Sequence, residues 1–297
     1  MDLKIWFKET RPHFLLITPL IYSIGLVQAY VERFFDASSA VIGLVGALLA
    51  HISVNVINDY FDFKSGLDLK TRRTPFSGGS GILPAGLLNP KDVYVFSLSC
   101  LMLDIFIGSY FIYTKGLMLL PLVLIAGTTI YFYTTHLSRW MVGEFFTGLN
   151  FGPLLVLGSY FIQSGNYSLN ALAAGVIPGI LIGALLFLNE FPDVEADREV
   201  GRMNLVIRFG TRTSSKIYVA LLTSMYVWVL ISILLRLMPV SASVVYLTLP
   251  LALKTIRAVR RYHDDPNQIV SALSSNVMLD LSALALTIVG ILASILL

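Results

Sequence analysis

The sequence has few charged residues and almost no cysteine. Asp, Glu, Lys and Arg make up 13% of its 297 residues, about half the share that soluble globular chains carry. The one cysteine, Cys100, excludes an intramolecular disulfide and a cysteine-based zinc site. The net charge of +3 is too small to indicate nucleic acid as a partner. No small-residue cleavage site follows the first apolar stretch, so this stretch is predicted to be a membrane span rather than a signal peptide.

The hydrophobic residues, 56% of the chain, lie in long runs. A soluble amphipathic helix would instead place them at every third or fourth position. Nine runs approach the roughly 20 residues that a helix needs to cross about 30 Å of hydrocarbon. Helices are favoured because backbone groups in lipid must bond within their own segment. We therefore predict an all-α, polytopic membrane protein with a single domain, 1–297. Its nine spans are predicted at residues 14–31, 39–57, 93–113, 116–134, 142–163, 169–188, 216–236, 240–256 and 276–297.

The basic residues segregate in this arrangement. Of the 21 Lys and Arg residues, 18 fall on one side of the membrane, and only Arg33, Lys115 and Arg236 fall on the other. Cytoplasmic loops of membrane proteins are enriched in Lys and Arg. We therefore expect the N-terminus and the two long polar connections, 58–92 and 189–215, to face the cytoplasm, in the plasma membrane of a prokaryote.

These two connections begin with a similar pattern. Asn58 stands four residues before Asp62, Asn189 stands four before Asp193, and Asp197 repeats the spacing. Residues four apart share one face of a helix. Two spans are thus predicted to present an amide and carboxylates at the cytoplasmic boundary, and their recurrence indicates an internal pseudo-repeat of helices.

A pair of facing acidic clusters is typical of a site for Mg²⁺ and a diphosphate. Mg²⁺ is commonly held by one or two carboxylates together with phosphate oxygens. It stabilises the charge that builds on a leaving diphosphate as an allylic C–O bond breaks. Arginines would clamp the phosphate oxygens. The candidates are Arg11, Arg72, Arg73, Arg198 and Arg202. The alternative is that the acids are solvated and cap helices or pair with basic neighbours.

Polar residues within or beside the spans have two interpretations each. Glu144 and Asn150 would line a cavity for a polar acceptor, or hydrogen-bond to neighbouring helices. Tyr133 would be an ordinary interfacial residue, or its ring would face a developing allylic cation while its hydroxyl meets the diphosphate. The glycine-rich segment 77–81 would be a hinge or a nest of backbone amides for phosphate.

At these residues the sequence resembles the UbiA superfamily of intramembrane prenyltransferases. That family carries an NDxxD-type motif after its second helix and a DxxxD motif after its sixth. Here they stand as Asn58-Asp59-x-x-Asp62 and Asp193-x-x-x-Asp197. The resemblance extends over nearly the whole chain. It implies helices around a central cavity, with the two long connections forming a cytoplasmic cap.

Within the family the sequence is most similar to the MenA branch, which prenylates 1,4-dihydroxy-2-naphthoate. The matching stretches are 58–68, 143–144, 151–160 and 193–210, and the third aspartate, Asp68, stands six residues after Asp62. This resemblance implies a polyprenyl diphosphate donor, an aromatic acceptor and an apolar tunnel open to membrane lipid. Two alternatives remain open. One is prenyl transfer to a glycerol-phosphate lipid, as in archaeal ether-lipid synthesis, and the other is an ion-coupled transporter.

The resemblance also implies roles for individual residues. One Mg²⁺ would be bound by Asn58, Asp62 and Asp68 with Asp59 in support, and a second by Asp193 and Asp197. Arg11, Arg72 and Arg198 would contact the diphosphate. In all, we predict catalytic roles for Asp62, Asp193, Asp197 and Tyr133, and substrate contacts for Asn58, Asn189, Arg11, Arg72, Arg73, Arg198, Glu144 and Asn150.

Overall fold

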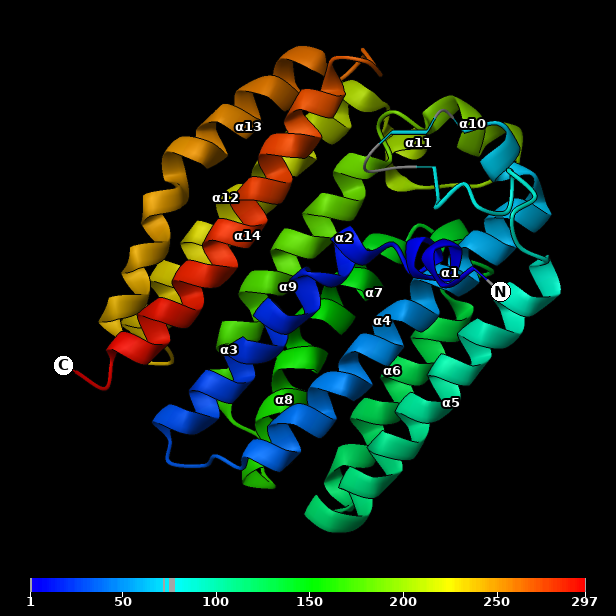
Figure 1. The fold of residues 1–297 in the computed structure, drawn as a ribbon. Coiled ribbons are helices and arrows are strands. Elements are labelled where there is room, and N and C mark those ends of the chain that lie inside the picture. Colours follow the sequence, from blue (N-terminus) through cyan, green and yellow to red (C-terminus); the bar gives the residue numbers. More distant parts are fainter. Residues whose placement is uncertain (1, 72, 75–77, 297) are drawn as a thin grey trace.

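The protein folds as a bundle of long helices (Figure 1). The computed structural model describes residues 2–71, 73–74 and 78–296, and no strand occurs within them. The α-helices are α1 (Leu3–Glu9), α2 (Pro12–Leu15), α3 (Ile17–Val31), α4 (Ala37–Ser65), α5 (Pro90–Lys115), α6 (Leu120–Phe132), α7 (Gly143–Leu149), α8 (Leu155–Ser164), α9 (Leu169–Asn189), α10 (Val194–Glu199), α11 (Leu205–Phe209), α12 (Thr211–Leu234), α13 (Leu249–Tyr262) and α14 (Ile269–Ala293). Four 3₁₀-helices are η1 (Leu67–Leu69), η2 (Leu117–Leu119), η3 (Leu137–Arg139) and η5 (Val240–Thr248), and one π-helix is η4 (Asn150–Leu154).

The prediction of an all-α membrane protein is confirmed. Within the described residues, eight helical segments are long and apolar enough to cross a membrane, and they match eight of the nine predicted spans. The remaining span, predicted at 116–134, is a shorter apolar helix, Leu117–Phe132. It begins directly after Gly116, whose φ of 121° ends α5, a backbone conformation that glycine adopts readily.

The ends of several helices differ from the predicted spans, and two of them differ by seven or eight residues. The second span was predicted to stop at residue 57, whereas α4 continues to Ser65 and ends at Gly66 in the left-handed conformation. The last span was predicted to begin at residue 276, whereas α14 begins at Ile269. In α4 the extra turns carry the polar motif, and hydropathy alone does not reveal that polar side chains remain helical when they face the protein interior.

The helix α9 lies at the centre of the bundle (Figure 1). In its most apolar window 67% of the residues are buried, the largest share of any candidate span. It packs closely against α7 and η4, where glycines allow the backbones to approach. A Cβ added at Gly152 would lie only 2.4 Å from the Cα of Gly179 and 2.5 Å from the carbonyl oxygen of Gly175. Small residues serve this purpose at helix contacts in membranes.

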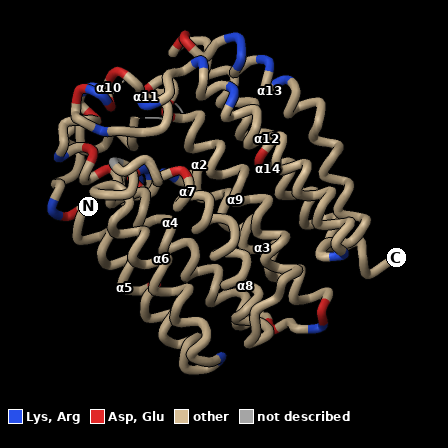
Figure 2. The backbone as a smooth tube through the Cα atoms, turned by 180° about the vertical axis from the view of Figure 1, so that it is seen from behind, with Lys and Arg blue, Asp and Glu red and all other residues tan. Residues whose placement is uncertain are grey.

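The outer surface of the bundle is apolar, and the charges gather at one end (Figure 2). Phe106 is 66% exposed and Tyr113 is 90% exposed, which is expected of side chains that face lipid. The charged end carries α1, α10, α11 and the polar connection after α4. Few basic residues lie at the opposite end, as the charge pattern of the sequence predicted. The chain is an integral membrane protein.

The contact between η4 and α9 yields a stability prediction. Gly152→Ala should lower the apparent melting temperature in detergent, because the new Cβ meets backbone that cannot move aside, and overpacking of this kind costs about 1–3 kcal/mol. Gly127→Ala is the matched control, since nothing lies within 4 Å of a Cβ at Gly127 in α6. Equal melting temperatures for the two variants would contradict the close packing of η4 on α9.

Candidate active site

The first acidic motif occupies the last two turns of α4. There the Asn58 side-chain amide donates to Asp62 Oδ2 at 3.0 Å, and Thr134 Oγ1 donates to Asn58 Oδ1 at 2.9 Å. These two bonds orient the Asp62 carboxylate. Gly66 then reverses the chain, and η1 returns Asp68 to a buried position beside the same helix end.

The second acidic motif is less regular than its spacing predicted. Asn189 is the last residue of α9, and Asp193 stands at the N-cap of the next short helix, α10. The two therefore do not share one helix face, because Pro192 lacks the amide hydrogen that a continuing helix needs. Asp197 lies in α10 and is buried, and its Oδ2 accepts from the Asn204 side chain at 2.8 Å.

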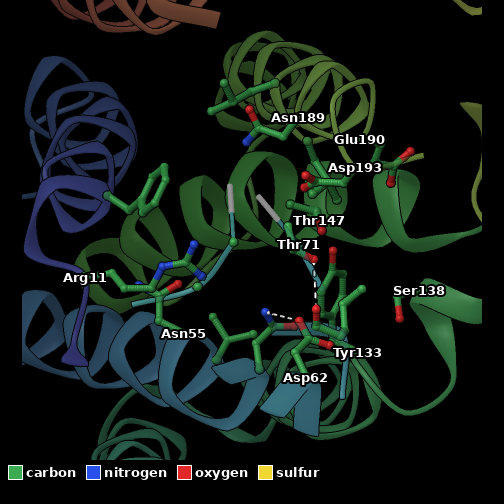
Figure 3. Close-up of a pocket in the computed structure, with 18 of the residues that line it drawn as sticks. Arg11, Asn55, Asp62, Thr71, Tyr133, Ser138, Thr147, Asn189, Glu190 and Asp193 are labelled. Carbon is green, nitrogen blue, oxygen red and sulfur yellow. Dashed lines mark hydrogen bonds between the residues drawn. The ribbon is translucent and has the colours of Figure 1, made fainter. Parts of the chain in front are cut away.

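Both motifs line one cavity of ≈ 240 Å³. Arg202 links them, since its Nη1 lies 3.7 Å from Asp62 Oδ2 and 3.6 Å from Asp197 Oδ1. These two carboxylate oxygens are therefore at most 7.3 Å apart, the sum of the two distances. Figure 3 shows Asp62 and Asp193 on opposite sides of the cavity, with Arg11 entering from a third side.

Arg11 belongs to a second network at the cavity rim. Its Nη1 lies 3.5 Å from Asp59 Oδ1, and the Ser80 amide donates to Asp59 Oδ2 at 2.7 Å. Ser80 Oγ donates to the buried Glu9 at 2.7 Å, and burial together with Asp59 raises the pKa of Glu9 to about 7. The network ties α1 and the glycine-rich segment to the end of α4. The Ser80 amide thus bonds a carboxylate here, rather than pointing to a phosphate nest.

Acidic residues outnumber basic residues in the lining of the cavity. Its lining includes five acidic residues, Asp62, Asp68, Glu190, Asp193 and Asp197, and two arginines, Arg11 and Arg202. Burial, then the neighbouring Asp62 and Asp59, raise the pKa of Asp68 to about 8. Burial also raises the pKa of Asp197, which Arg202 opposes. Crowded, desolvated carboxylates of this kind favour a bound cation.

The donor set fits a hard cation. Asp68 Oδ2 is buried without a hydrogen-bond partner in the described part of the chain. A Cβ built on Gly79 would lie 3.0 Å from Asp68 Oδ2 and 3.2 Å from Asp59 Oδ1, so glycine leaves open a small space that two carboxylates face. No three His, Cys, Asp or Glu side chains among the described residues form a complete metal site.

A second, apolar cavity of ≈ 200 Å³ adjoins the first. It runs between α3, α4, α5, α6, η4 and α8, and small residues such as Gly43, Ala47 and Gly158 line it. The two cavities share five lining residues, which we call the neck: His51, Val54, Tyr133, Thr147 and Phe151. A molecule with an anionic head and an apolar tail fits this pair of cavities with its joining atoms at the neck.

Most of the predicted polar residues reach the cavity. Asn58, Asn189, Tyr133 and Arg11 line it. Arg198 does not, because it is exposed on α10. The Arg73 side chain hydrogen-bonds the carbonyl oxygen of Ser80. Arg72 lies outside the described residues.

The two polar residues of the fifth span lie beside the cavity of the acids rather than in it. Asn150 lines the adjoining apolar cavity. Its Oδ1 accepts from Thr129 of α6 at 3.0 Å, the interhelical bonding that was the alternative interpretation, and its side-chain amide donates to the Phe146 carbonyl at 2.7 Å. Glu144 is buried behind Glu190, to which it is hydrogen-bonded. Burial and this neighbour raise the pKa of Glu190 well above its usual value.

The sequence pattern did not indicate Glu190 or His51, which had no recognisable partner spacing. It indicated Arg202 only as one of several candidate arginines. Arg202 turns inward because α10 ends at Glu199 and Gly201 follows with φ of 74°, which lets the Arg202 amide donate to the Asp197 carbonyl at 2.9 Å. The sequence signal for this reversal was the glycine.

Comparison with known proteins identifies the family. Residues 17–278 match the UbiA prenyltransferase family. The chain belongs to this family. It is a prenyltransferase, and the resemblance predicted from the two motifs is confirmed.

Two relatives of this prenyltransferase illustrate its branch. It is 27% identical over 277 residues to 1,4-dihydroxy-2-naphthoate octaprenyltransferase of Bacillus subtilis, covering 92% of this chain and 87% of the relative. It is 26% identical over 277 residues to 2-carboxy-1,4-naphthoquinone phytyltransferase of Synechocystis, covering 90% of this chain and 86% of the relative. The predicted similarity to the naphthoate branch is confirmed.

Solved structures share the fold. A UbiA homolog from Aeropyrum pernix K1 superposes with a TM-score of 0.70 at 14% identity, covering 92% of this chain and 98% of the other. A UbiA homolog from Archaeoglobus fulgidus, bound to GPP and Mg²⁺, gives a TM-score of 0.62 at 14% identity, covering 95% and 99%.

The position of Arg202 yields a second stability prediction. In EDTA, Arg202→Gln should destabilise the protein by about 3–5 kcal/mol, because it leaves Asp62 and Asp197 buried without a compensating cation. Lys70→Gln is the control, since Lys70 pairs at 3.0 Å with the exposed Glu199, and exposed pairs contribute about 0–1 kcal/mol. Chemical denaturation compares the two. Similar losses would show that Arg202 does not compensate buried charge.

Proposed function

We propose that this prenyltransferase uses Mg²⁺ to transfer a polyprenyl group from its diphosphate to a hydroxylated aromatic acceptor of the dihydroxynaphthoate type. The supporting observation is the joined pair of cavities, one lined by two acidic motifs and the other apolar. The acceptor class is supported by the names of the Bacillus subtilis and Synechocystis relatives. Use of a divalent metal is supported by the donor set at Gly79 and by the Mg²⁺ bound to the Archaeoglobus fulgidus homolog.

The acidic motifs would hold the metal between them. Asn58, Asp62 and Asp68 would face one ion from the α4 side, and Asp193 and Asp197 a second from the α10 side. When bound, Mg²⁺ neutralises the carboxylates and the diphosphate and stabilises the charge on the leaving group. Without such cations the anionic substrate would enter a cavity whose acids outnumber its arginines.

Two arginines would act on the diphosphate directly. Arg11 and Arg202 both line the cavity. Arg11 pairs with Asp59, and Arg202 pairs with Asp62 and Asp197. Once cations satisfy these acids, the guanidinium groups would be available to phosphate oxygens. The predicted diphosphate contact by Arg198 has no support in its exposed position.

The neck would hold the reacting carbon. Diphosphate on one side and isoprene units on the other place C1 of the donor among the neck residues, with Tyr133 and Phe151 beside it. Aromatic faces stabilise a neighbouring cation, and the apolar walls exclude water that would otherwise capture it. This is the role that we propose for Tyr133.

The orientation in the membrane follows from the charges. We propose that the end bearing both motifs and most Lys and Arg residues faces the cytoplasm, with the segments 58–92 and 189–215 covering the active site of a single domain. Diphosphate would thus leave to water while the prenylated product stays in lipid.

Loss of either acidic motif should abolish turnover. Asp62→Asn or Asp193→Asn should lower diphosphate release by at least about 10²-fold in saturating Mg²⁺, because each removes a charged ligand without changing side-chain size. The control is Glu195→Gln, an exposed acid on α10, which should keep wild-type activity. The assay offers a prenyl diphosphate with dihydroxynaphthoate, and in parallel with a glycerol-phosphate lipid. Near-normal turnover of either Asp variant would contradict the metal assignment. If only the glycerol-phosphate lipid is prenylated, the acceptor is that lipid and not an aromatic compound.

The apolar cavity should limit the donor. Ala47→Phe places a ring in this cavity and should raise KM for a C20 donor more than for a C10 donor. Val41→Phe is the matched control on α4, where the side chain is 63% exposed towards lipid. Competition between the two donors, followed by mass spectrometry of the products, measures the preference. An unchanged preference in Ala47→Phe would show that the tail lies elsewhere.

A further inference from the structure

Substitution on a hydroxylated aromatic acceptor requires a group that removes the hydroxyl proton. Loss of this proton makes the ring carbon nucleophilic as the prenyl cation forms, and a positioned base must lie within hydrogen-bond reach of it. Such a base has to be close to C1 of the donor, which the two cavities place at the neck. The neck therefore restricts the search to five residues.

Only one of these five residues is a base at neutral pH. Val54 and Phe151 have no ionisable group, and the hydroxyls of Thr147 and Tyr133 are far too weakly basic. His51 remains, because a neutral imidazole carries a lone pair on one ring nitrogen that can accept a proton. It lines both cavities.

The structure holds the His51 ring firmly. Its Nδ1 lies 2.6 Å from Thr18 Oγ1, and its ring packs edge-on against Phe151 with centroids 4.7 Å apart. Phe151 lies in the π-helix η4, beside Gly152, whose backbone packs closely against α9. No hydrogen bond to the other ring nitrogen, Nε2, is found among the described residues. One nitrogen is thus anchored and the other is left for a ligand at the neck.

The same helix face carries the metal ligands. His51, Asn55, Asn58 and Asp62 follow one another along α4 at intervals of three or four residues, and all line the cavity. His51 lies almost two turns from Asn58, and therefore at the inner end of this row. His51 is therefore separated along α4 from the proposed metal ligands and adjoins the apolar cavity.

We propose that His51 is the catalytic base that accepts the proton from the hydroxyl of the aromatic acceptor. In this arrangement Nδ1–H donates to Thr18 and Nε2 carries the lone pair. The inference rests on the proposed function, because it needs a hydroxylated acceptor at the neck.

In the transfer step the donor C1–O bond breaks and its electron pair leaves with the diphosphate, while a bond forms between C1 and the acceptor ring carbon. The acceptor O–H proton passes to Nε2, and the C–O group becomes a ketone. The ring carbon then loses its former substituent, either as CO₂ from a carboxylate or as a proton that passes to the departed diphosphate. The electron pair of that broken bond restores the aromatic ring, and the oxygen takes its proton back from His51.

The test separates donor ionisation from transfer. In His51→Gln, transfer to dihydroxynaphthoate should fall by about 10²-fold or more in kcat. Mg²⁺-dependent hydrolysis of the donor without acceptor should stay within twofold, because ionisation does not need the base. His263→Gln, at the end of α13, is the histidine control and should retain both activities. An acceptor whose hydroxyl is already ionised at the assay pH should restore most of the transfer rate of His51→Gln.

Several outcomes would overturn the assignment. An unchanged kcat in His51→Gln would do so, as would equal losses of hydrolysis and transfer, or a deficit that is the same for ionised and neutral acceptors. Should His51→Gln fail to fold, Thr18→Val, which removes the Nδ1 partner, is tested for the same acceptor-dependent deficit, and its absence refutes the proposal. If the wild-type enzyme prenylates no hydroxylated aromatic, the proposed function itself fails. If it does so and the variants match it, only the role of His51 fails.

Discussion

Repulsion between buried carboxylates is the constraint on which this structure depends. Acids from two helix ends distant in sequence line one cavity, and Arg202 reaches one acid of each cluster. Such an assembly is costly unless cations offset it. Without a bound cation, the clustered acids raise the free energy of the folded protein. The cavity therefore favours a ligand that brings positive charge, and a diphosphate carrying Mg²⁺ would be such a ligand. In the proposed mechanism, the need for a metal follows from the acidic lining of the cavity rather than from a preformed set of ligands.

The rest of the fold positions this cavity at a boundary. Long apolar helices bring the acids to the end of the bundle where charged residues gather, and the adjoining apolar cavity extends among the spans. Glycines allow the backbones of η4 and α9 to approach closely, and the π-helix η4 carries Phe151 at the neck. In the proposed binding mode, the polar head, the reacting carbon and the apolar tail of one substrate would lie in three successive environments. The side chains at the transition, His51 and Tyr133 among them, would contact the reacting atoms.

Much of the architecture could be predicted from the sequence because a bilayer leaves few choices. Long apolar runs must be helices, and the distribution of Lys and Arg checks their number. The meeting of the two motifs could be anticipated from their matching spacing. The side of each span that faces inward could not be predicted, because apolar residues occur all round these helices. Nothing in the sequence therefore indicated that His51 faces the cavity. The position of each arginine depends on one turn, which the sequence pattern did not resolve. The turn at Gly201 directs Arg202 into the cavity, whereas Arg198, four residues earlier, is exposed.

The central claim is that cations and diphosphate bind the two motifs together, neither well without the other. Calorimetric titration of the purified protein with inorganic diphosphate, in EDTA and in excess Mg²⁺, measures this most directly. We expect saturable binding at one site per chain in Mg²⁺ and no measurable binding in EDTA. Equally tight binding in both buffers would contradict it, because the arginines alone would then suffice to hold the anion.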